Sequence, residues 1–555
     1  MRRWCLVNRL GRTITPYRPL ILLGWEGPPG ASGGALAAAM LEEWRGIPPL
    51  LQSCAALIFG ATDPNFDLLA HTADDEGIPY FAQVRTWMPP HIPSFALQRS
   101  WREETVSTGA VRAMYHQYPG LAGVQAVELN CFGLSGEERR YIAELIEISA
   151  EYGGLLSWQE ANDGCNLWVE VGADRELYRC IEAHPDILLP QWEMNVPKSM
   201  YLCHDSVMGL WLAGAVDNWG AEPQSWYWLD AGYTDLNSRP GEFDRGYRAG
   251  DRRKCPDGLW GQMILLGASS GATVYSIEPY RGVVAAEDGR GYATAWTRAI
   301  GPLLQWLITE RAIPDRATVH RKVRVAYHAD FENAAFAERS DIDCYRQELP
   351  DDHRMGAHTA RGRGSGLLYE GTYRLPHPFK MIPETGRYFW IPVLPKYASS
   401  DALLSFPEVL SPNAFAAARE VSAYFDRCYA PDGQGEAWIV CVGGTAFISQ
   451  THENLDTEQH FAVGAPLPMA IEGTLRAHQY IVARRSDKGG LSVHLGNYAG
   501  RTSRLLVHPG TNQAPPTVIE ARDSLTHPAK IQTRLSGNAL EITVSHHGAV
   551  DLSLE

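Results

Sequence analysis

Carboxylates stand at the ends of several apolar segments of this 555-residue chain. The segment LLSWQ, at 155–159, runs directly into Glu160, and the turn-forming residues Ala-Asn-Asp-Gly follow. Similar segments end on or near Glu26, Glu128, Glu193, Asp230 and Glu278. Like charges repel when they are crowded together, so several carboxylates gathered at one place indicate a function.

A pair of carboxyl groups is what glycoside hydrolysis requires. One carboxyl is kept protonated and donates its proton to the leaving oxygen, while an ionised partner activates water or attacks the sugar carbon. Aromatic rings near these carboxylates suit stacking on the apolar faces of sugars. The candidates for stacking are Trp158, Trp192, Trp228, Tyr233 and Tyr280. Trp158 comes two positions before Glu160, so strand alternation predicts that both point to one face.

Eight apolar segments are predicted to be the strands that position these side chains. They span 19–25, 54–61, 79–85, 123–130, 154–160, 186–194, 225–233 and 272–280. Helical patterns lie between them, as at 135–154, where Ser135 is an expected N-cap and Gly153 marks the end. Near-continuous apolar strands alternating with helices are typical of parallel sheets, and eight strands close a (β/α)8 barrel. A doubly wound open sheet is the alternative.

The pattern changes after about residue 320. A mixed segment at 321–435 includes one well-marked helix at 411–429, with Ser411 as N-cap and Pro412 in its first turn. From 436 to 555, short alternating strands are separated by Gly and Asn turns, which predicts a β-sandwich. The expected fold class is therefore α/β plus all-β: a catalytic barrel at 1–320, a connecting segment packed on the barrel, and a C-terminal β-sandwich.

Composition excludes some partners. The net charge is −15, with dispersed Lys and Arg, which argues against nucleic acid and anionic membranes as partners. The chain has no apolar run long enough to span a membrane. Ten dispersed cysteines form neither a zinc motif nor a disulfide framework. The N-terminal apolar stretch is too short for a signal-peptide core, which predicts a cytoplasmic chain or one whose export signal has been removed.

Four stretches of the chain resemble glycoside hydrolase family 98. They are VQAVELNCFGLSGEERRYIAELIEISAEYGGLLSWQEAN, SVMGLWLAGAVDNWGAEPQSWYWLDAGY, LLYEGTYRLPHPFKMIPETGRYFWIPVLP and FISQTHENLDTEQ. The resemblance implies a β/α barrel followed by a β-rich domain, with inverting, endo-acting cleavage of β-1,4 linkages in an oligo- or polysaccharide. It also implies no metal or organic cofactor. Family members include blood-group endo-β-galactosidases and endo-β-1,4-xylanases, and they are typically secreted.

The resemblance also assigns roles to single residues. Glu160, in SWQEAN, matches the family's general acid, while Asp230, in WYWLDAGY, and Glu278, in YSIEPY, match the pair that holds and activates water. Asp217, in AVDNWG, is a rival for the base, although it falls at the wrong end of its βα unit. Glu193 is a candidate for substrate binding, with a salt bridge to a barrel arginine as the alternative.

Other motifs have ordinary structural explanations. GASSG at 267–271 matches the serine-hydrolase elbow, but it ends a helix and precedes a strand, so a tight turn is the better interpretation. THENLDTEQH at 451–460 lacks metal-site spacing. Asp205, after His204, is expected to cap a helix.

Two other classes of function remain open. One is a non-catalytic glycan-binding protein on a degenerate barrel. The other is an assembly role for the C-terminal domain. The oligomeric state and the choice between galactoside and xylan substrates are left open by the sequence.

Overall fold

The computed structural model describes most of the chain in segments. They are residues 8–25, 27–28, 30–84, 105–127, 136–159, 167–194, 200–223, 257–277, 295–329, 391–410, 424, 427–450, 458–476, 478–497, 502–510, 514–523, 529–546 and 548–555. The statements below concern these residues.

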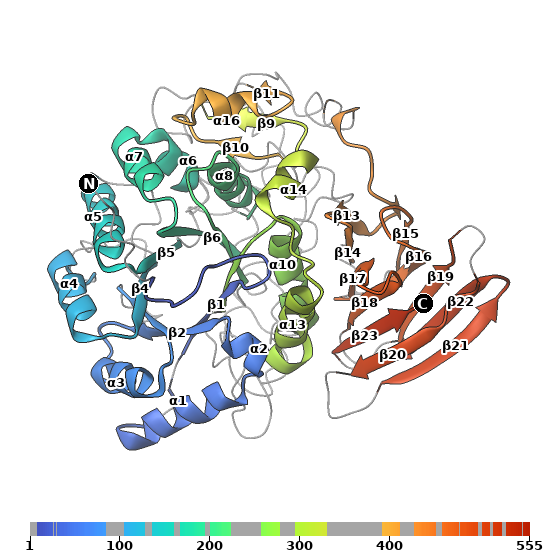
Figure 1. The fold of residues 1–555 in the computed structure, drawn as a ribbon, viewed down its shortest axis with the longest axis horizontal. Helices are drawn as coiled ribbons and strands as arrows, with labels where there is room; N and C mark the ends of the chain where they lie inside the picture. Colours follow the sequence, from blue (N-terminus) through green and yellow to red (C-terminus); the bar gives the residue numbers. More distant parts are fainter. Residues whose placement is uncertain are drawn as a thin grey trace, which may run out of the picture.

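Eight parallel strands form a closed barrel, as predicted (Figure 1). They are β1 (Leu20–Gly24), β2 (Ala55–Gly60), β3 (Tyr80–Gln83), β4 (Leu121–Val127), β5 (Leu155–Gln159), β6 (Leu188–Met194), β7 (Gly220–Pro223) and β8 (Val274–Ile277). Pairing of β8 with β1, through Val274 and Leu20, closes the circle. Their almost complete burial explains why most of the residues in these strands are apolar.

The seventh strand was predicted at the wrong place. β7 is the tetrapeptide Gly220–Pro223, where Trp192 pairs with Ala221 on one side and Gly220 pairs with Val274 on the other. Gly and Pro have low strand propensity, so the sequence GAEP gives a weak signal beside the aromatic run that follows it. The predicted strand at 225–233 lies outside the described residues.

Helices cover the outer face of the barrel. They are α1 (Gly34–Gly46), α2 (Pro49–Gln52), α3 (Phe66–Glu76), α4 (Thr108–Gln117), α5 (Gly136–Tyr152), α6 (Leu167–Ala173), α7 (Arg175–Ala183), α8 (Met200–Leu212), α10 (Asp257–Ser269), the π-helix η3 (Trp296–Ile300), α13 (Gly301–Thr309) and α14 (Arg316–Lys322). The GASSG motif lies where α10 ends and the chain turns into β8, as predicted. Within the described residues, no helix has both the length and the apolar content needed to cross a membrane.

The inner face of the barrel is divided into an apolar layer and a polar one. Alternate strand residues fill the half nearest the N-terminal ends of the strands: Leu20, Leu22, Ala56, Ile58, Phe81, Ala122, Leu155, Leu189 and Val274. Leu10 and Ile14, from the segment before β1, belong to the same cluster and extend it beyond the strands. The polar layer lies nearer the C-terminal ends, where barrel enzymes carry their active sites.

The connecting segment packs on α8. Its short parallel sheet has the order β10 (Val393–Leu394), β9 (Ala326–His328), β11 (Val409–Leu410), and the helix α16 (Ser400–Leu404) lies between β10 and β11 along the chain. Gly209 of α8 meets the Val393 carbonyl so closely that a Cβ would overlap it. Most of the helix predicted at 411–429 lies outside the described residues, and the domain boundaries at 320 and 435 stay predictions.

Two antiparallel sheets of six strands form the C-terminal domain (Figure 1). In spatial order, one contains β12 (Gln434–Gly435), β15 (Gln459–Val463), β16 (Ala470–Leu475), β19 (Thr502–His508), β22 (Ala539–Ser545) and β21 (Lys530–Ser536). The other contains β13 (Trp438–Val442), β14 (Thr445–Ser449), β17 (Tyr480–Arg485), β18 (Leu491–Gly496), β23 (Ala549–Leu554) and β20 (Val518–Asp523). Side chains from both sheets share one core, so the predicted fold class is confirmed.

His204 and Asp205 lie inside α8 and not at its start. The helix begins at Met200, so the predicted capping role of Asp205 is wrong; both side chains are fully buried. His204 Nδ1 lies 3.1 Å from Asp205 Oδ1, and burial lowers the pKa of His204 to about 3. The imidazole is therefore neutral at pH 7.

Acid should destabilise the fold through His204. Below pH 6.5 the unfolded chain binds a proton at this histidine that the folded chain does not, so the free energy of unfolding falls as the pH falls. We expect a loss of about 2 kcal/mol from this residue between pH 7 and pH 5, measured by urea unfolding. The variant His204→Gln should show a correspondingly flatter pH dependence, and an unchanged dependence would contradict the expectation.

Gly123 permits the close contact between β4 and its neighbours. A Cβ there would lie 2.5 Å from the Leu155 carbonyl oxygen and 2.5 Å from the Phe81 ring. Gly123→Ala should lower the free energy of unfolding by about 1–3 kcal/mol, the usual cost of overpacking. Gly136→Ala is the control because nothing lies within 4 Å of its Cβ position, and denaturant midpoints compare the two. Equal midpoints would refute the packing argument.

Candidate active site

A polar layer occupies the inner face of the barrel towards the C-terminal ends of β3 to β8. Its members are Gln83, Gln125, Ser157, Gln159, Gln191, Glu193, Glu222 and Ser276. All but Gln83 are buried, with exposed fractions of the residue between 0% and 4%. Buried polar groups on this scale require hydrogen-bond partners, and the layer supplies many of them internally.

Three glutamines and a glutamate form one line of hydrogen bonds across the barrel. Gln83 Nε2 donates to Gln125 Oε1 (3.3 Å), and Gln125 Nε2 donates to Gln159 Oε1 (3.1 Å). Gln159 Nε2 then donates to Glu222 Oε1 at 2.7 Å. Every bond runs in the same direction, and such chains strengthen by mutual polarisation. The carboxylate is thus the terminal acceptor of a line that connects β3, β4, β5 and β7.

Glu193 stands beside Glu222. The two residues are partners in the register of β6 and β7, so two carboxyl side chains lie next to each other on the inner face. Glu193, predicted to bind substrate, is 4% exposed. Adjacent carboxyls in a buried setting are the arrangement that acid–base sites use. Its predicted role in substrate binding stays a prediction.

Gln191 makes hydrogen bonds that are separate from the glutamine line. Its Nε2 donates to Ser157 Oγ at 3.2 Å, and its own backbone carbonyl accepts from Trp168 Nε1 at 3.2 Å. Gly220 faces the Gln191 amide so closely that a Cβ would overlap it. The glycine in β7 therefore makes room for an amide of the polar layer.

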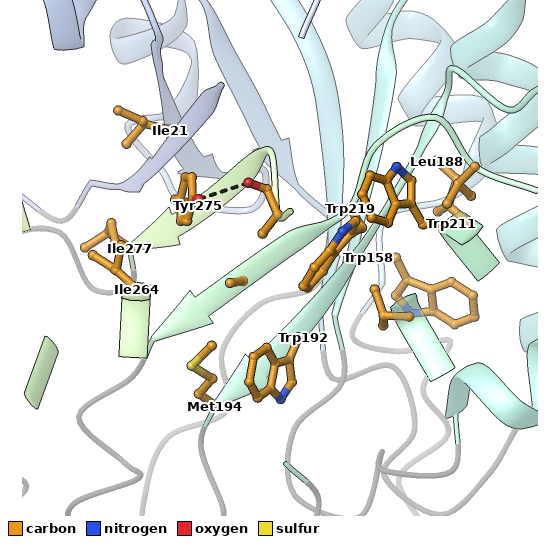
Figure 2. Packing of buried hydrophobic residues seen from close by; sticks show 14 of the residues in the cluster. Ile21, Trp158, Leu188, Trp192, Met194, Trp211, Trp219, Ile264, Tyr275 and Ile277 are labelled. Carbon is orange, nitrogen blue, oxygen red and sulfur yellow. Dashed lines mark hydrogen bonds between the residues drawn. The ribbon is translucent and has the colours of Figure 1, made fainter. Parts of the chain in front are cut away.

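Trp158 and Trp192 lie on the outer face of the barrel (Figure 2). Alternation along β5 and β6 directs Gln159 and Glu193 inward and the two tryptophans outward. Trp158 packs edge-on against Trp168 of α6 at 5.1 Å, and the Trp192 ring lies 4.5 Å from that of His204. Both are 0% exposed, so this placement contradicts the stacking role predicted for them. Gln159 is the last described residue of β5, and Glu160 lies outside the described residues.

The three predicted catalytic carboxylates lie outside the described residues. Along the chain, Glu160 directly follows the last residue of β5 and Glu278 directly follows the last residue of β8. Asp230 belongs to the connection from β7 to α10. The aromatic candidates Trp228, Tyr233 and Tyr280 also lie outside the described residues.

Asp217, the rival for the base, lies at the opposite end of the barrel. It precedes β7, its backbone N–H donates to the Pro185 carbonyl at 2.7 Å, and its carboxylate is 3.4 Å from Arg316 Nη2. The N-terminal ends of barrel strands contribute to stability and not to chemistry. Asp217 is therefore excluded as the base.

The glutamine line was not predicted, although the sequence carries a signal for it. Apolar strands each contain one glutamine near the end, as in YFAQ, VQAV, LLSWQ and LLPQW. Glu222 was missed because GAEP was not identified as a strand. For metals, the described part of the chain holds no group of three or more His, Cys, Asp or Glu side chains arranged to bind an ion.

Comparison with known proteins extends over most of the chain. Residues 62–310 match the model of glycosyl hydrolase family 98, and residues 361–514 match the model of that family's C-terminal domain. A blood-group-substance endo-1,4-beta-galactosidase from Clostridium perfringens is 22% identical over 467 residues, which cover 80% of this chain. The chain spans 51% of that relative's length.

Solved structures show the same fold. The catalytic module of a family 98 glycoside hydrolase from Streptococcus pneumoniae TIGR4, in complex with the H-disaccharide blood group antigen, superposes with a TM-score of 0.74 at 18% identity. The match covers 98% of this chain and 99% of that one. The same module with the LewisY pentasaccharide antigen gives a TM-score of 0.74 at 17% identity, with the same coverage. With both family models matched in order, the chain belongs to glycoside hydrolase family 98.

Proposed function

We propose that this glycoside hydrolase is an endo-acting enzyme that cleaves β-1,4-galactosidic linkages in blood-group glycans with inversion of configuration. The observation that carries the proposal is the buried polar layer, which places Glu193 and Glu222 side by side within residues 62–310, the part of the chain that matches the family 98 model. The relative's name and the antigens bound by the similar module favour blood-group glycans over xylan.

In this proposal Glu160 is the general acid. It follows Gln159, whose amide is fixed by hydrogen bonds to both Gln125 and Glu222. A catalytic group is most effective when the residues behind it are locked in one conformation. Glu160 protonates the glycosidic oxygen as the bond to the sugar carbon breaks, and the leaving sugar departs with that proton.

Asp230 and Glu278 hold and deprotonate the attacking water. Asp230 follows β7 and Glu278 follows β8 along the chain, and these two strands neighbour each other in the barrel. Water attacks the face of the sugar opposite the leaving group, which inverts the configuration. This geometry requires a separation of about 6.5–9.5 Å between acid and base, leaving room for the water.

Glu222 is assigned a positioning role, and Glu193 keeps its predicted role in substrate binding. Both are almost fully enclosed, and Glu222 accepts the Gln159 amide. Through the Gln159 amide, Glu222 holds β7 against β5.

Glu160→Gln should abolish cleavage of a type 2 blood-group oligosaccharide. The amide is nearly isosteric but cannot donate the required proton, so we expect kcat to fall by about 10²–10⁴-fold. Product release is measured by chromatography for the wild type and the variant, with glucuronoarabinoxylan as a second substrate. Asp217→Asn is the matched control and should retain wild-type turnover.

Three results would change the proposal. Turnover by Glu160→Gln equal to wild type would place the acid elsewhere. Cleavage of the xylan alone would replace galactoside with xylan as the substrate. Binding of the oligosaccharide without product, in the wild type, would favour a glycan-binding protein.

The first product released should carry the α configuration at its new reducing end. Cleavage of a β linkage by a single displacement inverts the anomeric carbon. Proton NMR during the first minutes distinguishes the anomers before mutarotation mixes them. An initial β product would indicate a retaining mechanism and contradict the roles given to Asp230 and Glu278.

A further inference from the structure

Helix α10 lies between the barrel and the C-terminal domain (Figure 1). One side contacts β7 of the barrel, and another contacts β14 and β17 of the sandwich. Residues 258–270 are all buried, which explains the apolar composition of the helix around its whole circumference. α10 is thus the element through which the sandwich reaches the barrel wall at β7.

The side of α10 that faces the sandwich carries glycines that allow the helix to pack closely on the sheet. Gly258 and Gly261 are one turn apart on one face. A Cβ at Gly258 would overlap the backbone carbonyl of His478, and a Cβ at Gly261 would overlap the Tyr480 hydroxyl and lie 2.5 Å from its ring carbons. Only glycine at these two positions lets the helix lie this near the sheet.

Directional hydrogen bonds fix the same contact. Gln262 is 1% exposed, and its Nε2 donates to Ser449 Oγ at 2.8 Å and to the Gln450 carbonyl at 3.1 Å. Both acceptors belong to the sandwich, at and just after the end of β14. Packing sets how near the helix lies, and these bonds set its position along the sheet.

The other side of α10 presses on β7. A Cβ at Gly267 would overlap the Ala221 side chain, so helix and strand are in direct contact. Ala221 points outward, and its neighbour Glu222 points inward to accept the Gln159 amide. A shift of α10 therefore moves the strand that carries the terminal acceptor of the glutamine line.

We infer that the C-terminal sandwich is a positioning part of the catalytic apparatus, acting through Gly261 and Gln262 on α10 to hold β7 and Glu222 in place. This inference rests on the proposed hydrolase function. It differs from a separate sugar-binding or assembly role for the sandwich, because the domain acts on turnover without touching substrate.

Gly261→Ala in the full chain tests the inference. The new methyl group forces α10 away from β17, and we expect kcat to fall about ten- to a hundredfold with little change in KM. Tyr480→Leu removes the ring that the methyl meets, so the double variant should regain most of the turnover of Tyr480→Leu alone. Such rescue is a coupling that two independent losses of stability do not produce.

Ile542→Ala is the matched control. Ile542 lies fully buried in the sandwich core, on β22 of the sheet that lacks β14 and β17, so its loss weakens the domain away from α10. It should lower the unfolding temperature while kcat below that temperature stays at wild type. Equal losses of kcat in Ile542→Ala and Gly261→Ala, or no rescue by Tyr480→Leu, would overturn the inference.

Hydrogen–deuterium exchange gives a readout that needs no substrate. Gly261→Ala should speed exchange in a peptide covering β7, and Ile542→Ala should not. If Gly261→Ala does not fold, Gln262→Leu, which keeps the size but removes both hydrogen bonds, should give the same changes in kcat and exchange. Unchanged exchange in β7 overturns the inference, while a wild type inactive on every glycan tested overturns the proposed function alone.

Discussion

The hydrogen bond from Gln159 to Glu222 is the interaction on which the site depends. It joins β5 to β7 across the barrel interior, at the end of a line that starts at Gln83. Both groups are buried. A hydrogen bond between an amide and a carboxylate is stronger in the protein interior than at the surface. The strands that precede Glu160 and Asp230 along the chain are therefore tied together near their C-terminal ends.

The rest of the structure maintains the conditions for that bond. The apolar layer, with Leu22 and Leu189 among its members, seals the barrel below the polar groups. Trp158 and Trp192, although not sugar platforms, fix the helices α6 and α8 against the outside of β5 and β6. Helix α10, which packs on both the sandwich and β7, holds β7 in place.

Much of the fold was predictable because parallel strands covered on both faces have a strong apolar signature. Seven of the eight strands follow from it, whereas β7 does not, since Gly220 and Pro223 give it no such signature. Tertiary packing, which the local sequence does not encode, decided which face of β5 each side chain took. Trp158 was assigned to the site because it comes two positions before Glu160. In the structure it is buried on the outer face of the barrel. Predicting the glutamine line would have required knowing which strands face one another in the barrel.

The central claim is that the site joins an acid after β5 to a water-activating pair after β7 and β8. The most direct measurement is a crystal structure of Glu160→Gln with an intact blood-group oligosaccharide bound. The scissile linkage should lie over the C-terminal ends of β5 to β8, with the side chains at 160 and 230 separated by about 6.5–9.5 Å on opposite faces of the sugar. A sugar bound elsewhere, or a separation near 5 Å, would contradict it.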